Sequence, residues 1–261
     1  MRYFLYSYVK GSKSVKSLAT ALKAAGKKVH IRSKGVVWKK KWRKPTTLDC
    51  VINWGNSNAH PNIANTALYY NGPTDVGIAI NKLAAFRLFQ DAGVPIPEFT
   101  TDIAVARTWL PNSMVVCRTL LRASGGRGIV LAKTEDELVQ APLYVKYRRK
   151  TNEYRVHVIR GVIQLIHEKR LRNKENRGDN FNPYICNHDN NWVFCNPKDP
   201  VPEVVKQSAL DAVSALHLDF GAVDIIYNSK FSKAYVLEVN TAPGMANESK
   251  TVQAYAQGFL R

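Results

Sequence analysis

Two short runs of sequence decide the fold of this chain: Val223-Asp224-Ile225-Ile226 and Leu237-Glu238-Val239-Asn240-Thr241-Ala242-Pro243-Gly244. Each run has the apolar composition of a β-strand, interrupted by an acid or an amide. The polar turn Asn228-Ser229-Lys230 lies between them, so we expect two neighbouring strands. Because side chains alternate along a strand, Glu238 and Asn240 lie on the same face.

The acids in these strands have two interpretations that the residues alone leave open. An ionised carboxylate in an apolar strand is costly unless it is paired. Asp224, Glu238 and Asn240 could converge as oxygen ligands of Mg²⁺, which prefers carboxylate, carbonyl and water oxygens completed by substrate phosphates. In the other interpretation, the two acids are paired with Lys or Arg side chains inside a sheet.

The composition is that of a globular protein. A chain of 261 residues is long enough for one large domain or for two to three small ones, and 45% hydrophobic residues argue against disorder. No apolar run approaches the roughly 20 residues of a membrane span. The first nine residues are too short and too aromatic for a signal peptide. Without C-x-x-C spacing, four scattered cysteines predict a reducing compartment and no metal cluster: Cys50, Cys117, Cys186 and Cys195.

The net charge of +18, from 38 Lys and Arg against 20 Asp and Glu, favours an acidic partner such as a nucleotide, a nucleic acid or an acidic polypeptide. The densest basic runs are 38–44, 146–150 and 169–174, and the first two interleave Trp or Tyr residues that could stack bases. Basic loops that only keep the protein soluble are the alternative. Charge alone does not decide the function.

Residues 1–72 read as a small parallel α/β domain. Its expected elements are a strand over 2–9, a helix from Ser12 or Ser14 to Ala25, a strand over 29–31, a basic loop over 34–47 and a strand over 49–55. Ligands of such sheets bind where the strands end. The polar residues expected at that edge are Asn53, Trp54, Asn56 and Ser57.

Residues 73–141 read as a second unit built around a glycine-rich hairpin. Its expected elements are a helix over 75–90, an extended segment over 97–100, a short helix over 102–110, strands over 114–118 and 129–132, and a helix over 134–140 with the capping box Thr134-x-x-Glu137. The loop Ala123-Ser124-Gly125-Gly126-Arg127-Gly128 joins two strands, whereas a P-loop or a dinucleotide fingerprint needs a following helix. A hairpin suits a lid whose backbone N–H groups close over phosphates, and ordinary turn chemistry is the alternative.

Residues 142–261 read as a third unit that contains the two carboxylate strands. The other expected elements are strands over 143–147, 153–159, 162–169 and 192–194, a polar loop over 171–190, and helices over 202–216 and from about 247. The dipeptide Arg160-Gly161 predicts a hairpin between two of these strands.

Taken together, this order resembles an ATP-grasp enzyme, in the branch of the glutamate-adding ligases that modify ribosomal proteins, and within it the short phage-type members. Four motifs carry the resemblance: Asn81-Lys82-x3-Phe86-x6-Gly93-Val94-Pro95-x-Pro97, the hairpin from Arg118 to Ile129, Glu153-Tyr154-Arg155, and Asp224 with Glu238 to Gly244. The resemblance implies an α/β (α+β) ATP-grasp fold, with two α+β subdomains that grip ATP behind a small parallel α/β N-terminal domain.

The resemblance also implies roles for individual residues, with ATP and one or two Mg²⁺ ions as cofactors and Mn²⁺ as a substitute. Asp224, Glu238 and Asn240 would hold the metal, and the catalytic residues would be Arg155, Arg170 and Asn240, since guanidinium groups match phosphate or carboxylate oxygens. The expected ATP-binding residues are Arg118, Ser124, Gly125, Gly126, Arg127 and Gly128 on the hairpin, Tyr144, Val145, Lys146 and Tyr147 at the adenine, Glu153 at the ribose, and Lys169. The chain departs from the family at Arg118, where many members have Lys, and by the lack of an acid at the adenine hinge.

The activity implied is ATP-dependent carboxylate–amine ligation through an acylphosphate, with release of ADP and phosphate. Positioning and electrostatics supply such catalysis, so no protein nucleophile is required. We interpret the isolated histidines His157, His167 and His188 as structural or substrate-facing. Two alternatives stay open: a nucleotide-binding module without turnover, and a kinase that uses a hydroxyl acceptor.

The partners expected are ATP, a carboxylate donor and an amine acceptor, with no membrane. The charge favours an acidic polypeptide or a nucleic acid, of which we prefer the polypeptide. The acceptor is expected at the N-terminal strand ends, the 38–44 run and the asparagine-rich loop 173–191, which includes Arg177, Asn180, Asn182 and Asn187. We expect a cytoplasmic protein, in the host cytoplasm if it is phage-encoded.

Overall fold

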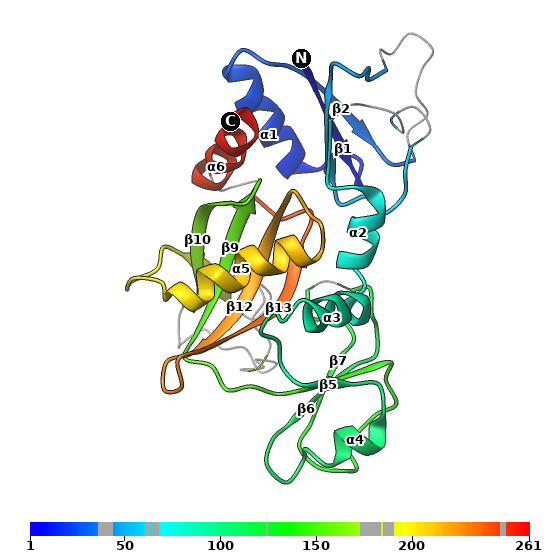
Figure 1. The fold of residues 1–261 in the computed structure, drawn as a ribbon, viewed down its shortest axis with the longest axis vertical. Helices are drawn as coiled ribbons and strands as arrows, with labels where there is room; N and C mark the ends of the chain where they lie inside the picture. The colour runs from blue at the N-terminus through cyan, green and yellow to red at the C-terminus, as the bar shows by residue number, and fades with distance from the viewer. Residues whose placement is uncertain are drawn as a thin grey trace.

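The computed structural model describes residues 1–35, 44–60, 63, 68–123, 125–172, 184, 191–245 and 249–261. Three sheets follow one another along the long axis of the molecule (Figure 1). The architecture is the expected α/β (α+β) class, with a parallel sheet first and two antiparallel sheets after it. Among the described residues, no helix combines the length and the apolar character needed to cross a membrane.

The N-terminal sheet is parallel and has the strand order β2-β1-β3-β4. Its elements are β1 (Arg2–Ser7), α1 (Lys13–Ala24), β2 (Lys28–Ser33), β3 (Cys50–Trp54) and β4 (Leu68–Tyr70), of which β4 was not predicted. Ser12 begins α1 because its hydroxyl accepts a hydrogen bond from the Val15 N–H at 3.4 Å. The apolar face of α1 is buried against the sheet, as its helical spacing predicts.

The second sheet is antiparallel and has the order β5-β8-β6-β7. Its elements are α2 (Pro73–Ala79), α3 (Lys82–Asp91), β5 (Phe99–Thr100), α4 (Ile103–Arg107), β6 (Val115–Arg118), β7 (Ile129–Ala132) and β8 (Leu143–Lys146). The predicted β6–β7 hairpin is present. The sequence division at residue 141 placed β8 in the third unit, but β8 pairs with β5 and β6, so this sheet extends to Lys146.

Two helix predictions in this region are wrong. The single helix expected over 75–90 is two helices, because the Asn81 side chain accepts a hydrogen bond from the Ala84 N–H at 3.3 Å and begins a new helix there. The helix expected over 134–140 is absent. The Glu137 carboxylate accepts from the backbone N–H of Lys133 at 2.6 Å, so the supposed capping box closes a turn instead.

The third sheet has the order β11-β10-β9-β12-β13, with every neighbouring pair antiparallel. Its strands are β9 (Asn152–Ile159), β10 (Val162–Leu171), β11 (Trp192–Cys195), β12 (Phe220–Asn228) and β13 (Lys233–Asn240). Arg160 and Gly161 both have positive φ, 52° and 71°, which is the backbone of the tight hairpin predicted there. The helix α5 (Glu203–Ala215) covers one face, so the other face is left to form a site (Figure 1).

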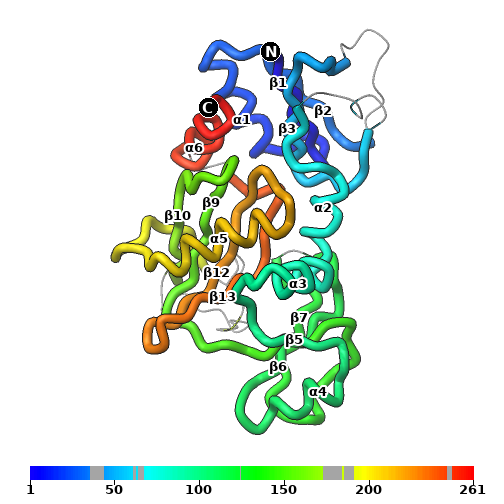
Figure 2. The backbone as a smooth tube through the Cα atoms, in the orientation of Figure 1, coloured from blue at the N-terminus to red at the C-terminus, as the bar shows by residue number. Residues whose placement is uncertain are grey.

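The last helix, α6 (Ser249–Leu260), returns to the N-terminal domain and lies beside α1 (Figures 1 and 2). Trp54 of β3 stacks on Phe220 of β12 with ring centroids 5.4 Å apart. Tyr255 and Phe259 of α6 pack into the same cluster. The N-terminal sheet and the third sheet therefore share one aromatic core.

Candidate functional site

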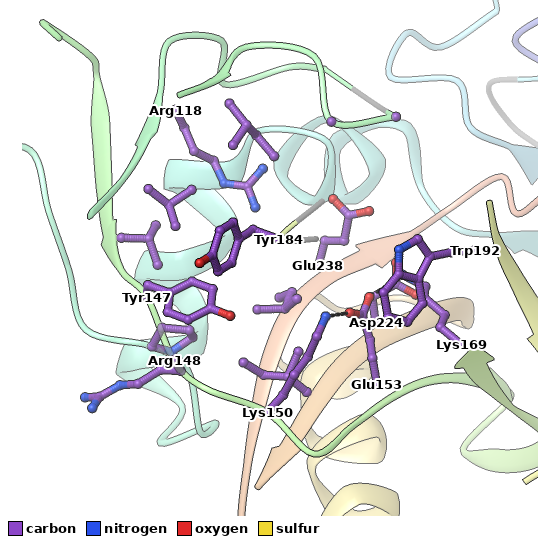
Figure 3. Close-up of a pocket in the computed structure, with 18 of the residues that line it drawn as sticks. Arg118, Tyr147, Arg148, Lys150, Glu153, Lys169, Tyr184, Trp192, Asp224 and Glu238 are labelled. Atoms are coloured by element: carbon purple, nitrogen blue, oxygen red, sulfur yellow. Dashed lines mark hydrogen bonds and ion pairs between the residues drawn. The ribbon is translucent and has the colours of Figure 1, made fainter. Parts of the chain in front are cut away.

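A cavity of about 650 Å³ lies between the second sheet and the third sheet. The β6–β7 hairpin and β8 form one side, and strands β9, β10, β12 and β13 form the other. Figure 3 shows the acids on the third sheet with the hairpin residue Arg118 across from them. The predicted site residues that line this cavity are Arg118, Gly125, Gly126, Arg127, Val145, Lys146, Tyr147, Glu153, Arg155, Lys169, Asp224 and Glu238.

Asp224 lies at the centre of the third sheet, in register with Glu238 on one side and with Arg155 on the other. The Arg155 guanidinium donates to both carboxylate oxygens of Asp224, at 2.7 and 2.8 Å. Lys169 donates to the same carboxylate at 3.1 Å. Burial alone would raise the pKa of Asp224, but the charges of Arg155 and Lys169 outweigh it and hold that pKa below its ordinary value.

Glu153 is the second buried acid of this face. Its carboxylate accepts from Lys169 at 2.5 Å and also from Lys150. Lys169 therefore bridges Glu153 and Asp224 (Figure 3). Burial would lower the pKa of Lys169, but the two carboxylates raise it overall, so the lysine stays charged.

Glu238 is paired with a lysine from the second unit. Lys82 at the start of α3 places its Nζ atom 3.1 Å from a Glu238 carboxylate oxygen and donates to the Ala123 carbonyl at 2.9 Å. Burial opposes the ionisation of Glu238, but the charge of Lys82 lowers its pKa overall. Asn240 does not line the cavity, and its amide nitrogen lies 3.4 Å from Glu238 Oε1.

These ion pairs match the second interpretation of the acids, in which Lys and Arg neutralise them. Among the described residues there is no group of three His, Cys, Asp or Glu side chains arranged to hold a metal ion. The three residues expected to bind the metal are two carboxylates, Asp224 and Glu238, and one amide, Asn240, so they do not form a group of this kind. The assignment of Asp224, Glu238 and Asn240 to a metal stays a prediction.

The glycine-rich hairpin covers the cavity from the side of the second sheet. Arg118 at the end of β6 has a buried Nε atom with no hydrogen-bond partner among the described residues. Burial lowers the pKa of Arg118, and the nearby Glu238 partly offsets this effect. Gly128 does not line the cavity, but it has a φ of +72° and an added Cβ would lie 2.8 Å from Leu120. Ser124 lies outside the described residues.

The predicted adenine hinge consists of the end of β8 and the residue that follows it. Val145, Lys146 and Tyr147 line the cavity. Tyr144 points into the core of the second sheet, where its hydroxyl accepts from the Ala141 N–H at 2.8 Å, so only its backbone could serve a ligand. An acid does lie beside the hinge, directly before β5: Glu98 accepts from Lys146 at 3.1 Å.

Arg170, like Asn240, is a predicted catalytic residue that lies outside the cavity lining. It follows Lys169 on β10, and alternation turns it to the opposite face of the sheet. There it donates through Nε to Glu168 at 3.0 Å and through Nη2 to the Asn196 carbonyl at 3.1 Å. Arg170 does not line the cavity.

Several residues that line the cavity were not assigned from the sequence, among them Lys82, Lys150, Trp192 and Phe194. Lys82 stands in the quoted Asn81-Lys82 motif, which was the available signal, and Lys150 belongs to a noted basic run. Trp192 and Phe194 were interpreted only as strand residues. The Arg155 guanidinium carbon lies 4.4 Å from the Phe194 ring centroid, so this ring helps to fix Arg155 beside Asp224.

His157 and His167 are not isolated, contrary to the sequence interpretation. Their ring centroids are 5.3 Å apart, and the His157 Nδ1 atom lies 3.1 Å from the Tyr255 hydroxyl. Burial, with the neighbouring His167, lowers the pKa of His157 to about 3. His157 is therefore a neutral member of the core. The third histidine, His188, lies outside the described residues, as do most of the 38–44 run and of the 173–191 loop.

Solved structures with the same architecture are ATP-grasp ligases. PsnB, complexed with a phosphomimetic variant of its minimal precursor, Mg and ADP, has a TM-score of 0.70 at 13% identity, over 99% of this chain and 97% of that chain. MdnC, a macrocyclase from Microcystis aeruginosa MRC bound with its precursor peptide MdnA, has a TM-score of 0.66 at 12% identity, over 100% of each chain. D-alanine–D-alanine ligase from Bacillus anthracis has a TM-score of 0.70 at 15% identity, over 100% of this chain and 93% of that chain.

No protein-family model and no curated protein sequence matches the chain. Identities of 12–15% with TM-scores of 0.66–0.70 over nearly the whole of each chain relate the architectures and not the sequences in detail. The glycine-rich hairpin and the paired carboxylate strands that face it therefore belong to a known architecture. The chain has the ATP-grasp fold.

Proposed function

We propose that the chain is an ATP-dependent carboxylate–amine ligase that forms an amide bond through an acylphosphate and releases ADP and phosphate. One observation carries this proposal: Asp224 and Glu238 stand in register on adjacent strands and line one cavity with the glycine-rich hairpin. The likeness to ATP-grasp ligases bound to Mg and ADP supports it. Within that group we place the chain in the glutamate-adding, phage-type branch. We keep the units 1–72, 73–141 and 142–261, with β8 of the third unit completing the sheet of the second.

The cavity fits a nucleoside triphosphate. The unpartnered buried Nε of Arg118 is a donor aimed at a region where an anion would satisfy it, and Gly125 and Gly126 let backbone N–H groups approach phosphates closely. We assign the backbone of 144–147 to adenine and Glu153 to the ribose hydroxyls. We assign Lys169 and Arg127, both on the cavity wall, to phosphate oxygens.

The carboxylates fit a hard divalent cation by their chemistry. Asp224, Glu238 and Asn240 would hold one or two Mg²⁺ ions, with Mn²⁺ as a substitute, and the metal would offset charge on the phosphates. Arg155 and Lys169 neutralise Asp224 in the structure described. A cation taken up by Asp224 would leave these two side chains to bind a phosphate or a substrate carboxylate.

The reaction would proceed by two displacements at the cavity. A substrate carboxylate oxygen attacks the γ-phosphorus of ATP, the bond to the β,γ-bridging oxygen breaks, and ADP leaves. An amine then attacks the acyl carbon, phosphate leaves with its oxygen, and the amine loses a proton to give the amide. Arg155, Lys169 and Arg118 would orient the reactants and offset the charge of the transferring group, which is the main catalytic need of such chemistry.

The test incubates the protein with MgATP and pools of amino acids, polyamines, peptides and nucleic acids. We expect ADP release that requires both a carboxylate and an amine, together with an amide product by mass spectrometry. The variants Asp224→Asn and Glu238→Gln should lose this turnover while keeping the wild-type circular dichroism spectrum. A phosphorylated product without an amide would instead establish the kinase alternative, and full turnover in both variants would refute the metal assignment.

A second candidate, a nucleotide-binding module without turnover, is favoured by the internal neutralisation of Asp224 and Glu238. Its partner would be an acidic polypeptide or a nucleic acid, drawn by the net charge of +18. Such a module would bind MgATP and release no ADP with any donor and acceptor pair, which separates it from the ligase in the same experiment.

A further inference from the structure

A second groove, of about 1050 Å³, lies behind the hinge and adjoins the nucleotide cavity. It runs between the turn that joins β12 to β13 and the edge of the second sheet. Its described lining contains six Lys or Arg side chains and no Asp or Glu. The six cations are Lys133, Lys146, Arg148, Arg149, Lys150 and Lys233.

Half of these cations have acidic partners and half do not. Lys146 and Arg148 pair with Glu98, and Lys150 pairs with Glu153. In Figure 3, Lys150 points toward Glu153, while Arg148 points away from the acids of the cavity. The other three are exposed and form no ion pair with any described residue: Lys133, Arg149 and Lys233.

Two buried polar atoms of the groove are unsatisfied. Arg148 Nε is a donor and Asn228 Oδ1 is an acceptor, and neither has a hydrogen-bond partner among the described residues. Buried polar groups are rarely left unpaired, so each points to a ligand or to water. A peptide group supplies both a carbonyl and an N–H, whereas a phosphodiester supplies acceptors only.

The aromatic residues of the groove separate two classes of polyanion. The Lys133 ammonium lies 5.6 Å from the Tyr184 ring centroid, and the Arg148 guanidinium lies 5.5 Å from that of Tyr235. Tyr147 packs edge-on against Tyr184. These rings hold cations and one another in place, so their faces are occupied and do not form a platform for stacked bases.

We propose that this groove, lined by the six cations, is a docking site for an acidic segment of a polypeptide. Carboxylates of Asp or Glu pair with Lys133, Arg149 and Lys233, and the peptide backbone satisfies Arg148 and Asn228. The groove shares Lys146, Tyr147, Arg148 and Lys150 with the nucleotide cavity, so a docked segment lies against the other side of the hinge. As a substrate-docking site, the groove rests on the proposed ligase function.

The N-terminal domain carries a second basic surface, which competes with the groove for acidic ligands. Residues 1–72 contain fourteen Lys and Arg and a single acid, Asp49, which pairs with Arg2. The helix α1, which carries exposed lysines, is separated from the β12–β13 turn by the length of the third sheet (Figures 1 and 2). Three charge reversals at either place change the net charge by the same amount. Comparing the two triple variants therefore distinguishes binding in the groove from attraction by the overall charge.

The experiment measures the anisotropy of fluorescein-labelled hexaglutamate on the full chain without nucleotide, at low and at moderate salt. We expect the triple variant Lys133→Glu, Arg149→Glu, Lys233→Glu to bind at least about tenfold more weakly than the wild type. The matched variant Lys13→Glu, Lys16→Glu, Lys23→Glu should change binding by less than about threefold. Neutral hexaglutamine should not bind, because it lacks the carboxylates.

Three results would overturn the proposal. The first is equal weakening by both triple variants, which would indicate general attraction by net charge. The second is oligothymidylate binding more tightly than hexaglutamate and being lost in the groove variant, which would assign the groove to nucleic acid. The third is absence of hexaglutamate binding at low salt. The binding assay contains no nucleotide and is therefore independent of turnover. Hexaglutamate binding in this assay, together with no ADP release in the MgATP turnover assay described above, would reject the ligase and keep the docking site.

Discussion

Lys82 and Glu238 form an ion pair of 3.1 Å that joins the first turn of α3 to the last strand of the third sheet. The same ammonium donates to the Ala123 carbonyl at the start of the glycine-rich loop. One lysine thus connects the predicted phosphate-covering hairpin with a predicted metal ligand. Its side chain is 10% exposed, so the pair is only weakly screened by solvent.

We expect Lys82→Met to destabilise the folded state by about 1–2 kcal/mol, because it leaves a partly buried carboxylate and a carbonyl without their donor. Urea unfolding measures this change. The control is Lys206→Met, which breaks the more exposed pair with Glu203 and should cost less than about 0.5 kcal/mol. Equal losses in the two variants would contradict the bridging role.

The buried imidazole of His157 predicts a pH dependence of stability. The pKa of His157 is about 3 in the folded state, because burial and the neighbouring His167 disfavour the protonated ring. In the unfolded state the pKa of a histidine is about 6.5. The unfolded state therefore binds more protons between these values. Stability is fully present above about pH 6.5 and is lost as the pH falls toward about 3, by up to about 1.4 kcal/mol per pH unit.

Thermal or urea unfolding across this range should show a shallower slope in His157→Gln than in the wild type. The variant keeps a polar group for the Tyr255 hydroxyl but cannot take up a proton. The control His217→Gln removes an exposed imidazole after α5 and should leave the slope unchanged. An unchanged slope in His157→Gln would show that other groups determine the acid sensitivity.

Gly55, directly after β3, brings the N-terminal domain close to the segment that follows the carboxylate strands. Its φ is +81°, and an added Cβ would lie 2.8 Å from Ala242 and 2.9 Å from Tyr8. Gly26 has a similar φ of +76° with open space around it. Gly26→Ala should therefore lower the free energy of unfolding by about 1 kcal/mol. Gly55→Ala should lower it by about 1–3 kcal/mol more than Gly26→Ala does, as measured by urea unfolding. Equal costs would mean that Ala242 and Tyr8 move aside freely.

Lys169 and Arg170 are consecutive residues with opposite environments, so they form a matched pair for the nucleotide site. Lys169→Met removes a cation from Glu153 and Asp224, and we expect ATP-dependent turnover to fall by about 100-fold. Arg170→Met removes a contact with Glu168 on the other face and should change turnover by less than about threefold. A larger loss in Arg170→Met would support the catalytic role that the family resemblance implies for it.

The sequence predicts the features that depend on local pattern. The paired strands of Asp224 and Glu238, the Arg160-Gly161 hairpin and the strand–loop–strand form of the glycine segment follow from alternation and turn chemistry. Local pattern was insufficient at Thr134-x-x-Glu137, where the glutamate bonds to Lys133 and no helix forms. It was also insufficient at Asn81, where capping within an amphipathic run starts a second helix.

Other features depend on contacts between distant parts of the chain. The membership of β8 in the second sheet is decided by pairing with β5 and β6, which its own sequence does not encode. The partners of Asp224 and Glu238 come from β9, β10 and α3, at separations that a strand pattern cannot specify. Many of the residues that line the cavity could therefore be named from sequence, but the neutralisation of its acids by Arg155, Lys169 and Lys82 could not.

The aromatic core that Trp54, Phe220, Tyr255 and Phe259 share has a consequence for folding cooperativity. The N-terminal sheet cannot lose its packing without exposing rings that also belong to the third sheet and to α6. These segments should thus melt in a single transition, although they are far apart in the sequence. A protease cut between β4 and α2 would leave the two fragments associated until heat or denaturant separates them.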